Sequence, residues 1–489
     1  MIQVIGLDVG TSAVKAVLLG ADQTILAAAS VALTIERPKP GWSEQHPEDW
    51  WNAAKEVIAR LAAAAPLRKV RAIGLSGQMH GAVLLDAAKK VIRPVILWND
   101  RRAVAQSEEL NAAIPDLGII AGVPAMTGFT APKLMWMARH EPANHARIAH
   151  ILPPKDYIRF KLTGKFATDM YEASGTLWLD IEKRQWSDTL IAASGISRAM
   201  LPELYEGNAI TGALNPALAA EWGIEPLVPI AAGAGDVAAA AIGMGVIGEG
   251  DGLISIGTSA QYFVASCAHR PAPRALIHAF AHGLPGCWSQ MAALLNGASC
   301  LGWAASLFKS VTLGDLMAQT EAAYRGAGDV LFLPYLTGER SPLNDPHAKG
   351  VLYGLTPGTD AAALMQAVME GVGFAIADGQ ESLSQAGIAA RTLAVTGGGA
   401  KSLLWMRILA SVLDRPLPVH TGTDYGPALG AARLARLSVT GERPQDVCQP
   451  PAGGRVIDPE PELVSSYRPR LDRFRALYQT LKPNFRMDS

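Results

Sequence analysis

The chain has few cysteines and almost no net charge, and each deficit excludes whole classes of protein. Its 489 residues include four cysteines, widely spaced and with no CxxC pair. Such usage argues against a disulfide framework and a structural zinc site, and it suits the reducing cytoplasm. The 43 Lys and Arg residues against 44 Asp and Glu give a net charge of −1. No basic surface is therefore expected to bind nucleic acid or an anionic membrane.

Leucine-rich segments of the membrane-spanning kind are also missing. The N-terminal "MIQVIGLDVG" lacks the basic region of a signal peptide and has Asp8 where an apolar stretch would continue. Residues 227–248 are long enough to span a bilayer, but they consist mainly of Ala and Gly, with Asp236 near the centre. A central Asp costs about 2.5–3.5 kcal/mol on insertion scales. We therefore expect a buried strand, a Gly-rich turn and a tightly packed helix there, in a cytoplasmic protein with no membrane partner.

Short apolar runs and helical periodicity organise the first half of the chain. Apolar runs predict strands over residues 2–8, 14–19, 23–35, 70–77 and 93–100. Apolar residues with helical spacing predict a helix over residues 46–66. Strands that alternate with helices are typical of an α/β domain with a mixed sheet, in which residues just beyond the strand ends line the ligand crevice.

The same plan restarts near residue 250 with a second strand, turn and strand. A helical region is expected over residues 291–325, a helix over 361–387 and a strand over 392–399. The chain exceeds the length that one hydrophobic core can serve. We therefore expect two copies of one α/β domain plan, residues 1–245 and 246–489, which meet across a deep interdomain cleft.

The tetrapeptide GTSA occurs twice, each time between two apolar runs. A turn of this kind exposes backbone N–H groups and hydroxyls, which bind phosphate. One copy alone would carry little weight, because hairpins also use Gly and Ser for conformational reasons. Two copies in equivalent places could hold a polyphosphate from both sides of a cleft. The residues concerned are Gly10, Thr11 and Ser12 in the first copy, with Lys15 nearby, and Gly257, Thr258 and Ser259 in the second.

Two aspartates near these turns are candidates for the chemistry. Asp8 precedes the first turn and could hold a Mg²⁺ ion that neutralises the phosphates; the alternative is an ordinary turn residue. Asp236 lies in "AAGAGDVAAAA", where no neighbour in sequence offers an ion pair, and a buried unpaired carboxylate is costly. It could accept the proton of a substrate hydroxyl that attacks a phosphoryl group. The alternative for Asp236 is a helix cap before "VAAAAIG".

Three further segments offer binding groups at strand ends. "TGGGAKS" (396–402) follows a strand and opens a helix, and its glycines would let a nucleotide lie against the backbone. It lacks the spacing of a Walker A loop, and a plain strand-to-helix turn is the alternative. The candidates here are Gly397, Gly398, Gly399 and Ala400. The other two segments provide Gln78, Met79 and His80, and Trp98, Asn99 and Asp100; on chemistry alone, His80 is more often a satisfied strand-end histidine than a ligand.

In their order and spacing, these segments resemble the FGGY family of carbohydrate kinases from residue 2 to about residue 440. "IGLDVGTSAVKAVLL" and "ISIGTSAQYF" resemble its two phosphate motifs, and "LAVTGGGAKSLLWMRILA" resembles its adenosine motif. Residues 128–141 and 350–371 match its two signatures, except that Ala363 replaces a residue that is usually polar. The resemblance implies duplicated actin-like (ribonuclease H-like) ATPase domains, ATP and Mg²⁺ as cofactors, and direct in-line phosphoryl transfer with Asp236 as the general base.

Other segments narrow the resemblance within the family. Residues 41–51, 76–86, 97–103, 152–164 and 204–214 look most like members that phosphorylate D-xylulose, in which the Met-His pair matching Met79 and His80 contacts the sugar. Val237 stands where many relatives have Asn or Gln, and Arg101 replaces a common Gly. The alternatives are a kinase for ribulose, fuculose, gluconate or glycerol, or a non-kinase ATP-binding module of the same fold. Similar kinases are often dimers, so a homodimer is a possible assembly.

Overall fold

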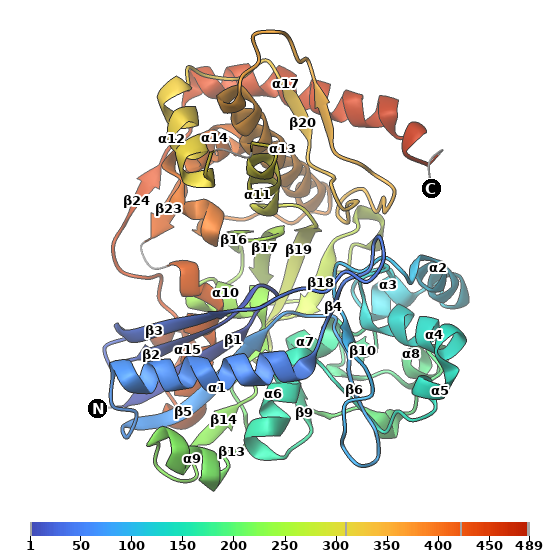
Figure 1. Ribbon diagram of the computed structural model, residues 1–489, viewed down its shortest axis with the longest axis vertical. Helices are drawn as coiled ribbons and strands as arrows, with labels where there is room; N and C mark the ends of the chain where they lie inside the picture. The colour runs from blue at the N-terminus through green and yellow to red at the C-terminus, as the bar shows by residue number, and fades with distance from the viewer. Residues whose placement is uncertain (1, 309–310, 421–422, 487–489) are drawn as a thin grey trace.

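Two seven-stranded sheets form the cores of two lobes (Figure 1). The structure is a computed structural model that describes residues 2–308, 311–420 and 423–486. The strands of the first sheet are β1 (Gln3–Val9), β2 (Ala13–Leu19), β3 (Ile25–Ala32), β5 (Val70–Gly77), β13 (Ile210–Ala213), β14 (Pro229–Ala231) and β15 (Ala234–Gly235). The strands of the second are β16 (Asp251–Ile256), β17 (Ala260–Ser266), β18 (His278–Ala281), β19 (Trp288–Leu294), β22 (Thr392–Thr396), β23 (Leu417–His420) and β24 (Gly454–Ile457).

The two sheets repeat one topology. The first has the order β13-β14-β5-β1-β2-β3, with β15 also paired to β5, and the second has the order β18-β19-β17-β16-β22-β23-β24. In each, an antiparallel hairpin (β1–β2 or β16–β17) is followed by a parallel neighbour (β5 or β22). The expected mixed sheets and the duplicated plan are confirmed. Each GTSA tetrapeptide begins in the turn of its hairpin, so the two turns occupy equivalent places.

Helices cover both sheets. In the first lobe they are α1 (Pro47–Ala64), α2 (Val104–Ala113), α3 (Leu117–Ile120), α4 (Thr130–His140), α5 (Pro142–His145), α6 (Pro154–Thr163), α7 (Met170–Ser174), α8 (Asp188–Ala193), α9 (Pro216–Trp222) and α10 (Asp236–Gly243). Later in the chain come α11 (Ser299–Ser306), α12 (Leu313–Ala323), α13 (Ala361–Gln385), α14 (Leu403–Leu413), α15 (Gly426–Thr440), α16 (Pro444–Val447) and α17 (Pro461–Leu481). The predicted helices over 46–66 and 361–387 are therefore confirmed as α1 and α13.

Two expectations for secondary structure were wrong. Of residues 93–100, only β7 (Val95–Ile96) is a strand, and it pairs with β4 (Glu44–Gln45) outside the main sheet. The region expected to be helical over 291–325 begins inside β19, which pairs with β17 and β18. The run "MAAL" at the end of β19 is buried on both faces, so it shows no alternation that would distinguish a strand from a helix.

The apolar segment at 227–248 contains β14, β15 and α10, which matches the expected strand, turn and helix. Among the described helices, only α13 is long and apolar enough for a membrane span, and 72% of its most apolar stretch is buried inside the protein. It packs against α14 and β19 in the core of the second lobe.

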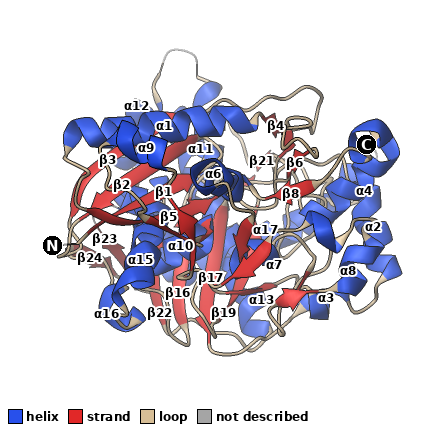
Figure 2. Cartoon of the chain, turned by 90° about the horizontal axis from the view of Figure 1, so that it is seen from below, coloured by secondary structure: helices blue, strands red, loops and turns tan. Residues whose placement is uncertain are grey.

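Helix α15 belongs to the second half of the chain but lies against the first sheet. It contacts β1 and β5 and packs against α10, as Figure 2 also shows. The approach is very close: a Cβ atom on Gly430 would lie 1.7 Å from the Ala239 carbonyl oxygen, and one on Gly74 would lie 1.9 Å from the Ala431 carbonyl oxygen. This crossing holds α10, and with it Asp236, against α15. The predicted domain boundary at 245/246 stays a prediction.

Replacement of Gly430 should therefore separate α10 from α15. We expect Gly430→Ala to lower the free energy of unfolding by about 2 kcal/mol or more, because the methyl group overpacks against backbone atoms that cannot yield. Gly302→Ala in α11 is the matched control, because a Cβ there meets nothing within 4 Å and Ala is the better helix former. Urea unfolding of both variants measures the difference; equal stabilities would contradict the close crossing.

Candidate active site

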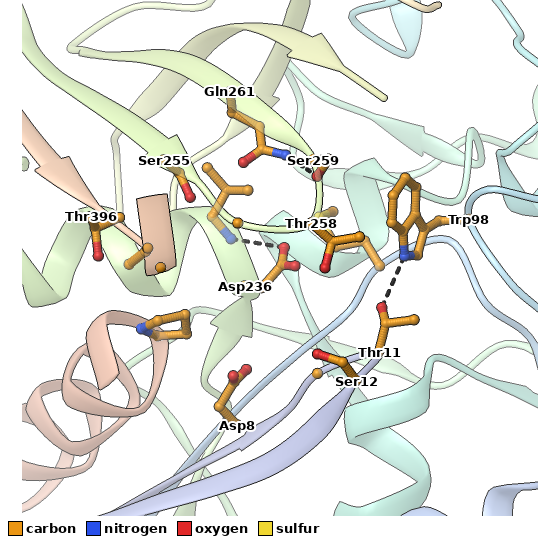
Figure 3. Close-up of a pocket in the computed structure, with 18 of the residues that line it drawn as sticks. Asp8, Thr11, Ser12, Trp98, Asp236, Ser255, Thr258, Ser259, Gln261 and Thr396 are labelled. Carbon is orange, nitrogen blue, oxygen red and sulfur yellow. Dashed lines mark hydrogen bonds between the residues drawn. The ribbon is translucent and has the colours of Figure 1, made fainter. Parts of the chain in front are cut away.

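A cleft between the lobes brings together most of the predicted site residues. It encloses roughly 1220 Å³ of empty space, part of which is open to solvent. Figure 3 shows the two turns pointing into the cleft from different sides, with Asp8 and Asp236 beside them. The predicted residues that line it are Asp8, Gly10, Thr11, Ser12, Lys15, Met79, His80, Trp98, Asp236, Gly257, Thr258, Ser259, Gly397 and Gly398.

The turns present backbone donors to the cleft. Within the described chain, the N–H groups of Thr11, Ser12, Thr258 and Ser259 have no hydrogen-bond acceptor. The Thr11 hydroxyl is already engaged: it donates to Gln78 Oε1 at 2.8 Å and accepts from Trp98 Nε1 at 2.9 Å. At Thr11, therefore, the backbone N–H rather than the hydroxyl is free for an anion. Successive unpaired N–H groups of this kind form an anion-binding concavity.

The two aspartates have raised pKa values. Burial, together with the negative charge of Asp8, raises the pKa of Asp236 to about 7. Burial also raises the pKa of Asp8 to about 6, although the positive charge of Lys15 and a hydrogen bond from Ser76 oppose the increase. A carboxylate whose pKa lies near neutrality is well suited to take up a proton in a reaction. The geometry and the charges therefore favour a general base at Asp236.

Asp236 also begins a helix, but it does not cap that helix: the N-cap is Gly235, and no described side chain caps α10, so the alternative of a helix cap is not borne out. The role of general base stays a prediction. Asp236 is the first residue of α10, and its Oδ1 accepts a hydrogen bond from the Val237 N–H at 2.8 Å. The helix start thus orients the carboxylate toward the cleft.

Asp8 suits a cation that is shared with a ligand. Its carboxylate extends into the cleft in Figure 3, and its Oδ1 accepts a hydrogen bond from the Ser76 hydroxyl at 3.2 Å. The described residues contain no group of three or more His, Cys, Asp or Glu side chains that could hold a metal ion by itself. Mg²⁺ commonly uses one or two protein carboxylates together with substrate phosphates and waters. The donor set fits Mg²⁺ bound jointly with a phosphate.

His80 lies at one end of the cleft with a defined tautomer. Its Nδ1 is 2.8 Å from the Gly175 carbonyl oxygen, so Nδ1 carries the proton and donates. Burial and the nearby Arg340 charge hold the pKa of His80 well below its usual value, which keeps the ring neutral. Nε2 is then left as an acceptor for a hydroxyl group, a narrower role than bonding through either ring nitrogen. The backbone there has φ +69, and Lys133 donates to the His80 carbonyl at 3.0 Å.

Arg340 is the main cleft residue that the sequence did not reveal. Its Nη2 donates to the Trp98 carbonyl oxygen at 2.9 Å, and its guanidinium lies 5.6 Å from the centre of the Trp98 ring. Burial lowers the pKa of Arg340 to about 10, while the charges of Glu339 and Asp236 oppose that decrease. Arg340 follows β20 (Leu331–Leu333) in an irregular loop. In the sequence, only the Glu339-Arg340 pair after an apolar run could have indicated this residue.

Arg101, a departure from the family pattern, makes a second bond between the lobes. Its Nη1 donates to the Pro346 carbonyl oxygen at 2.8 Å. Together with the bond from Arg340 to Trp98, this contact joins the loop at 98–102 to the loop at 337–348 beside the cleft. Val237, the other departure, lines the cleft with an apolar side chain.

Five predicted site residues lie outside the cleft: Gln78, Asn99, Asp100, Gly399 and Ala400. Asp100 is buried in an ion pair with Arg102 at 2.7 Å and accepts the Ser43 N–H at 2.7 Å. Asn99 lines a neighbouring cavity that shares Trp98 and Arg340 with the cleft. Gln78 is buried behind Thr11. Gly399 and Ala400 are buried beneath the turn at Gly397.

The glycine turn closes the other end of the cleft. Gly397 has φ +94, and a Cβ atom there would lie 2.5 Å from the Ile256 carbonyl oxygen, so only glycine fits. Thr396 bonds to the Thr423 carbonyl oxygen at 2.8 Å, and Lys15 bonds to the Asp424 carbonyl oxygen at 3.0 Å. In Figure 3, Thr396 and Trp98 lie on opposite sides of Asp236. The cleft thus has a glycine end and a tryptophan end, with the candidate base between them.

Comparisons with known proteins agree with this geometry. The models of the N-terminal and C-terminal domains of the FGGY family of carbohydrate kinases match residues 3–243 and 252–439. The xylulose kinase of Escherichia coli (strain K12) is 45% identical over 98% of this chain and 99% of its own. The xylulose kinase of Klebsiella pneumoniae is 42% identical over 98% and 99% of the two chains. A crystal structure described as a xyloylose kinase from Brucella ovis has a TM-score of 0.90 and 44% identity, and covers 98% of this chain and 99% of that one.

The chain belongs to the FGGY family of carbohydrate kinases. It is an enzyme of that family, and its fold is the duplicated actin-like ATPase fold that the sequence implied.

The raised pKa of Asp236 has a consequence for stability. Its folded pKa of about 7 exceeds the ordinary value of 3.8, so the folded protein binds the proton more tightly than the unfolded chain does, and the carboxylate costs stability as pH rises between these values. We expect Asp236→Asn to unfold at a higher temperature than the wild type at pH 8 and at the same temperature near pH 3. Thermal unfolding across pH measures this; no gain at pH 8 would show that the carboxylate is not desolvated.

Proposed function

We propose that the protein transfers the γ-phosphoryl group of ATP to the terminal hydroxyl of D-xylulose, giving ADP and xylulose 5-phosphate. The observation that carries the proposal is the position of Asp236, with its pKa near 7, between two turns of free backbone donors. The choice of sugar is supported by the names of the most similar relatives and by Met79 and His80 at the tryptophan end of the cleft.

The polyphosphate would lie between the two turns. The backbone N–H groups of residues 11–12 and 258–259 would donate hydrogen bonds to its oxygens, and the Ser12 and Thr258 side chains lie exposed at the same place. Gly397 and Gly398 would lie beneath the adenosine, where the absence of side chains gives it room. Mg²⁺, held by Asp8 and the phosphates, would offset negative charge on the phosphoryl group during transfer.

The sugar would occupy the tryptophan end. His80 Nε2 accepts a hydrogen bond from one hydroxyl, because its Nδ1 is committed to Gly175. The Trp98 ring forms a wall that Arg340 holds in place. Asp236 accepts the proton of the terminal hydroxyl as that oxygen attacks phosphorus, which is the role that its raised pKa favours. The bonds of Arg101 and Arg340 between the lobes help to keep water out of the site, so that the sugar rather than water is phosphorylated.

A coupled ADP-release assay across sugars tests the proposal. With ATP-Mg²⁺, we expect D-xylulose to give the highest kcat/KM among xylulose, ribulose, fuculose, gluconate and glycerol. Asp236→Ala should lower kcat by about 10²–10⁴-fold, because it removes the general base, while ATP binding measured by calorimetry persists.

The outcomes of this assay test the choice of sugar and the phosphoryl transfer separately. A different preferred sugar would contradict the assignment of D-xylulose but leave the phosphoryl transfer in place. No stimulation by any sugar, in a wild-type protein that binds ATP, would overturn the proposed activity.

A further inference from the structure

A cluster of buried charges lies directly behind the site and has no part in the chemistry described so far. Its members come from α6, from β9 (Ala167–Asp169) and from α7. Lys155, Asp156, Arg159 and Asp169 have side chains that are 0% exposed. Most of these residues belong to the segment at 152–164, which resembles the xylulose-phosphorylating branch and for which the cleft itself offers no role.

The charges are paired among themselves. Lys155 Nζ lies 2.6 Å from Asp156 Oδ1 and 2.6 Å from Asp169 Oδ2, and the Arg159 guanidinium lies 3.0 Å from Asp156 Oδ1. The adjacent Glu172 carboxyl has its pKa raised well above the usual value, chiefly by burial. The ion pairs themselves join two cations, Lys155 and Arg159, to two carboxyl groups, Asp156 and Asp169. Such a cluster is expensive to bury and a poor source of stability, since apolar residues of similar volume do as well or better.

One arm of the cluster holds the chain that leads to Asp236. Arg159 Nη1 donates to the Ala231 carbonyl oxygen at 2.9 Å and to the Thr211 hydroxyl at 2.6 Å. Arg159 Nη2 and Lys155 Nζ both donate to the Ala232 carbonyl oxygen. Ala231 is the last residue of β14 and Ala232 follows it, and β15 and Asp236 come within a few residues. The planar fork of Arg159 thus fixes the backbone from which the candidate base projects.

The other arm holds the helix that orients His80. The Asp169 side chain caps α7: its Oδ1 accepts the N–H groups of Tyr171 and Glu172 at 2.9 and 3.0 Å. The Gly175 carbonyl oxygen, which accepts the hydrogen bond from His80 Nδ1, lies just after this helix. The two segments held by the cluster also pack against each other near the site. A Cβ atom on Gly235, next to Asp236, would lie 2.9 Å from Cδ1 of Tyr171 in α7.

We infer that Arg159 and Asp169 are positioning residues for the phosphoryl transfer. Through one buried ionic cluster, they fix the position of the base Asp236 relative to His80, which accepts a hydrogen bond from a sugar hydroxyl. The inference rests on the proposed function. The two arms predict different kinetic defects. Loss of the forked hydrogen bonds of Arg159 displaces the base and lowers kcat. Loss of the Asp169 charge releases the start of α7 from Lys155, which lets His80 shift and raises the KM for the sugar. Neither arm touches the glycine end, so the KM for ATP stays unchanged.

Arg159→Lys tests the first arm. Lysine keeps the charge but cannot reproduce the forked hydrogen bonds. We expect kcat to fall by about ten- to a hundredfold, since misplacement of a reacting group by about 1 Å has effects of that size, with an unchanged KM for ATP. Arg470→Lys is the matched control. Arg470 likewise bonds a carboxylate, that of Glu370, at 3.0 Å and a carbonyl, that of Val330, at 2.9 Å, but does so away from the cleft. It should lower the unfolding temperature and leave kcat unchanged.

Asp169→Asn tests the second arm. Asparagine keeps an oxygen that can cap α7 but removes the charge paired with Lys155. We expect Asp169→Asn to raise the KM for the sugar more than it lowers kcat. If Arg159→Lys and Asp169→Asn only lower the unfolding temperature, as Arg470→Lys does, the cluster is structural and the inference is wrong.

If Arg159→Lys does not fold, Thr211→Val provides a second test of the contacts that Arg159 makes. It removes the hydroxyl that accepts a hydrogen bond from Arg159 Nη1 and donates one to the Ile230 carbonyl oxygen in β14, and it leaves every charge in place. A smaller fall in kcat, in the same direction, is expected, and an unchanged kcat would overturn the inference. All variants are compared on whichever sugar the wild type phosphorylates best. A wild type that phosphorylates no sugar would instead show that the proposed function itself had failed.

Discussion

The burial of the Asp236 carboxylate beside that of Asp8 is the constraint on which the rest of the site depends. Burial, together with repulsion from the Asp8 carboxylate in the same cleft, raises the pKa of Asp236 to about 7. In water, the same side chain would be too weak a base to take up a proton near neutral pH. The protein must therefore hold both carboxylates in place against a force that would separate or protonate them.

Three parts of the fold supply that restraint. The crossing of α10 and α15, in which backbone approaches backbone at Gly430, holds the helix that Asp236 begins. Strand β1, which carries Asp8, pairs in parallel with β5 in continuous register from Val4 to Val9. Behind them, Arg159 holds the carbonyls at the end of β14. The duplication of the hairpin then adds the second turn, so that donors from both lobes converge on one space.

The parts of the site that could be predicted from sequence are those built from contiguous residues. A Gly-Thr-Ser turn between strands and a glycine turn after a strand fix their own backbone, so the amino-acid order alone assigns Gly10, Thr258 and Gly397 to the cleft. The apolar neighbours of Asp236 likewise indicate that its carboxylate is buried, and this burial is the main cause of its raised pKa. The fold follows from the same motifs, because the order in which they occur is that of a duplicated domain.

The residues whose place the sequence did not predict depend on contacts between distant segments. Asp100 follows an apolar run and offers a carboxylate, but its pairing with Arg102 and with the backbone of Ser43 turns it away from the cleft. Arg340 reaches the cleft from an irregular loop far along the chain, where no periodicity marks it. The region expected to be helical at 291–325 begins in a strand, because an Ala-rich run buried on both faces carries no period.

In the proposed reaction the phosphoryl group passes directly from the nucleotide to the sugar, and Asp236 acts as a base rather than as a nucleophile. The stereochemical course at phosphorus tests it. ATP made chiral at the γ-position with oxygen isotopes is turned over with D-xylulose, and the configuration of the sugar phosphate is determined by ³¹P NMR. Direct in-line transfer predicts inversion. Retention would require a phosphorylated enzyme intermediate and would contradict the role assigned to Asp236.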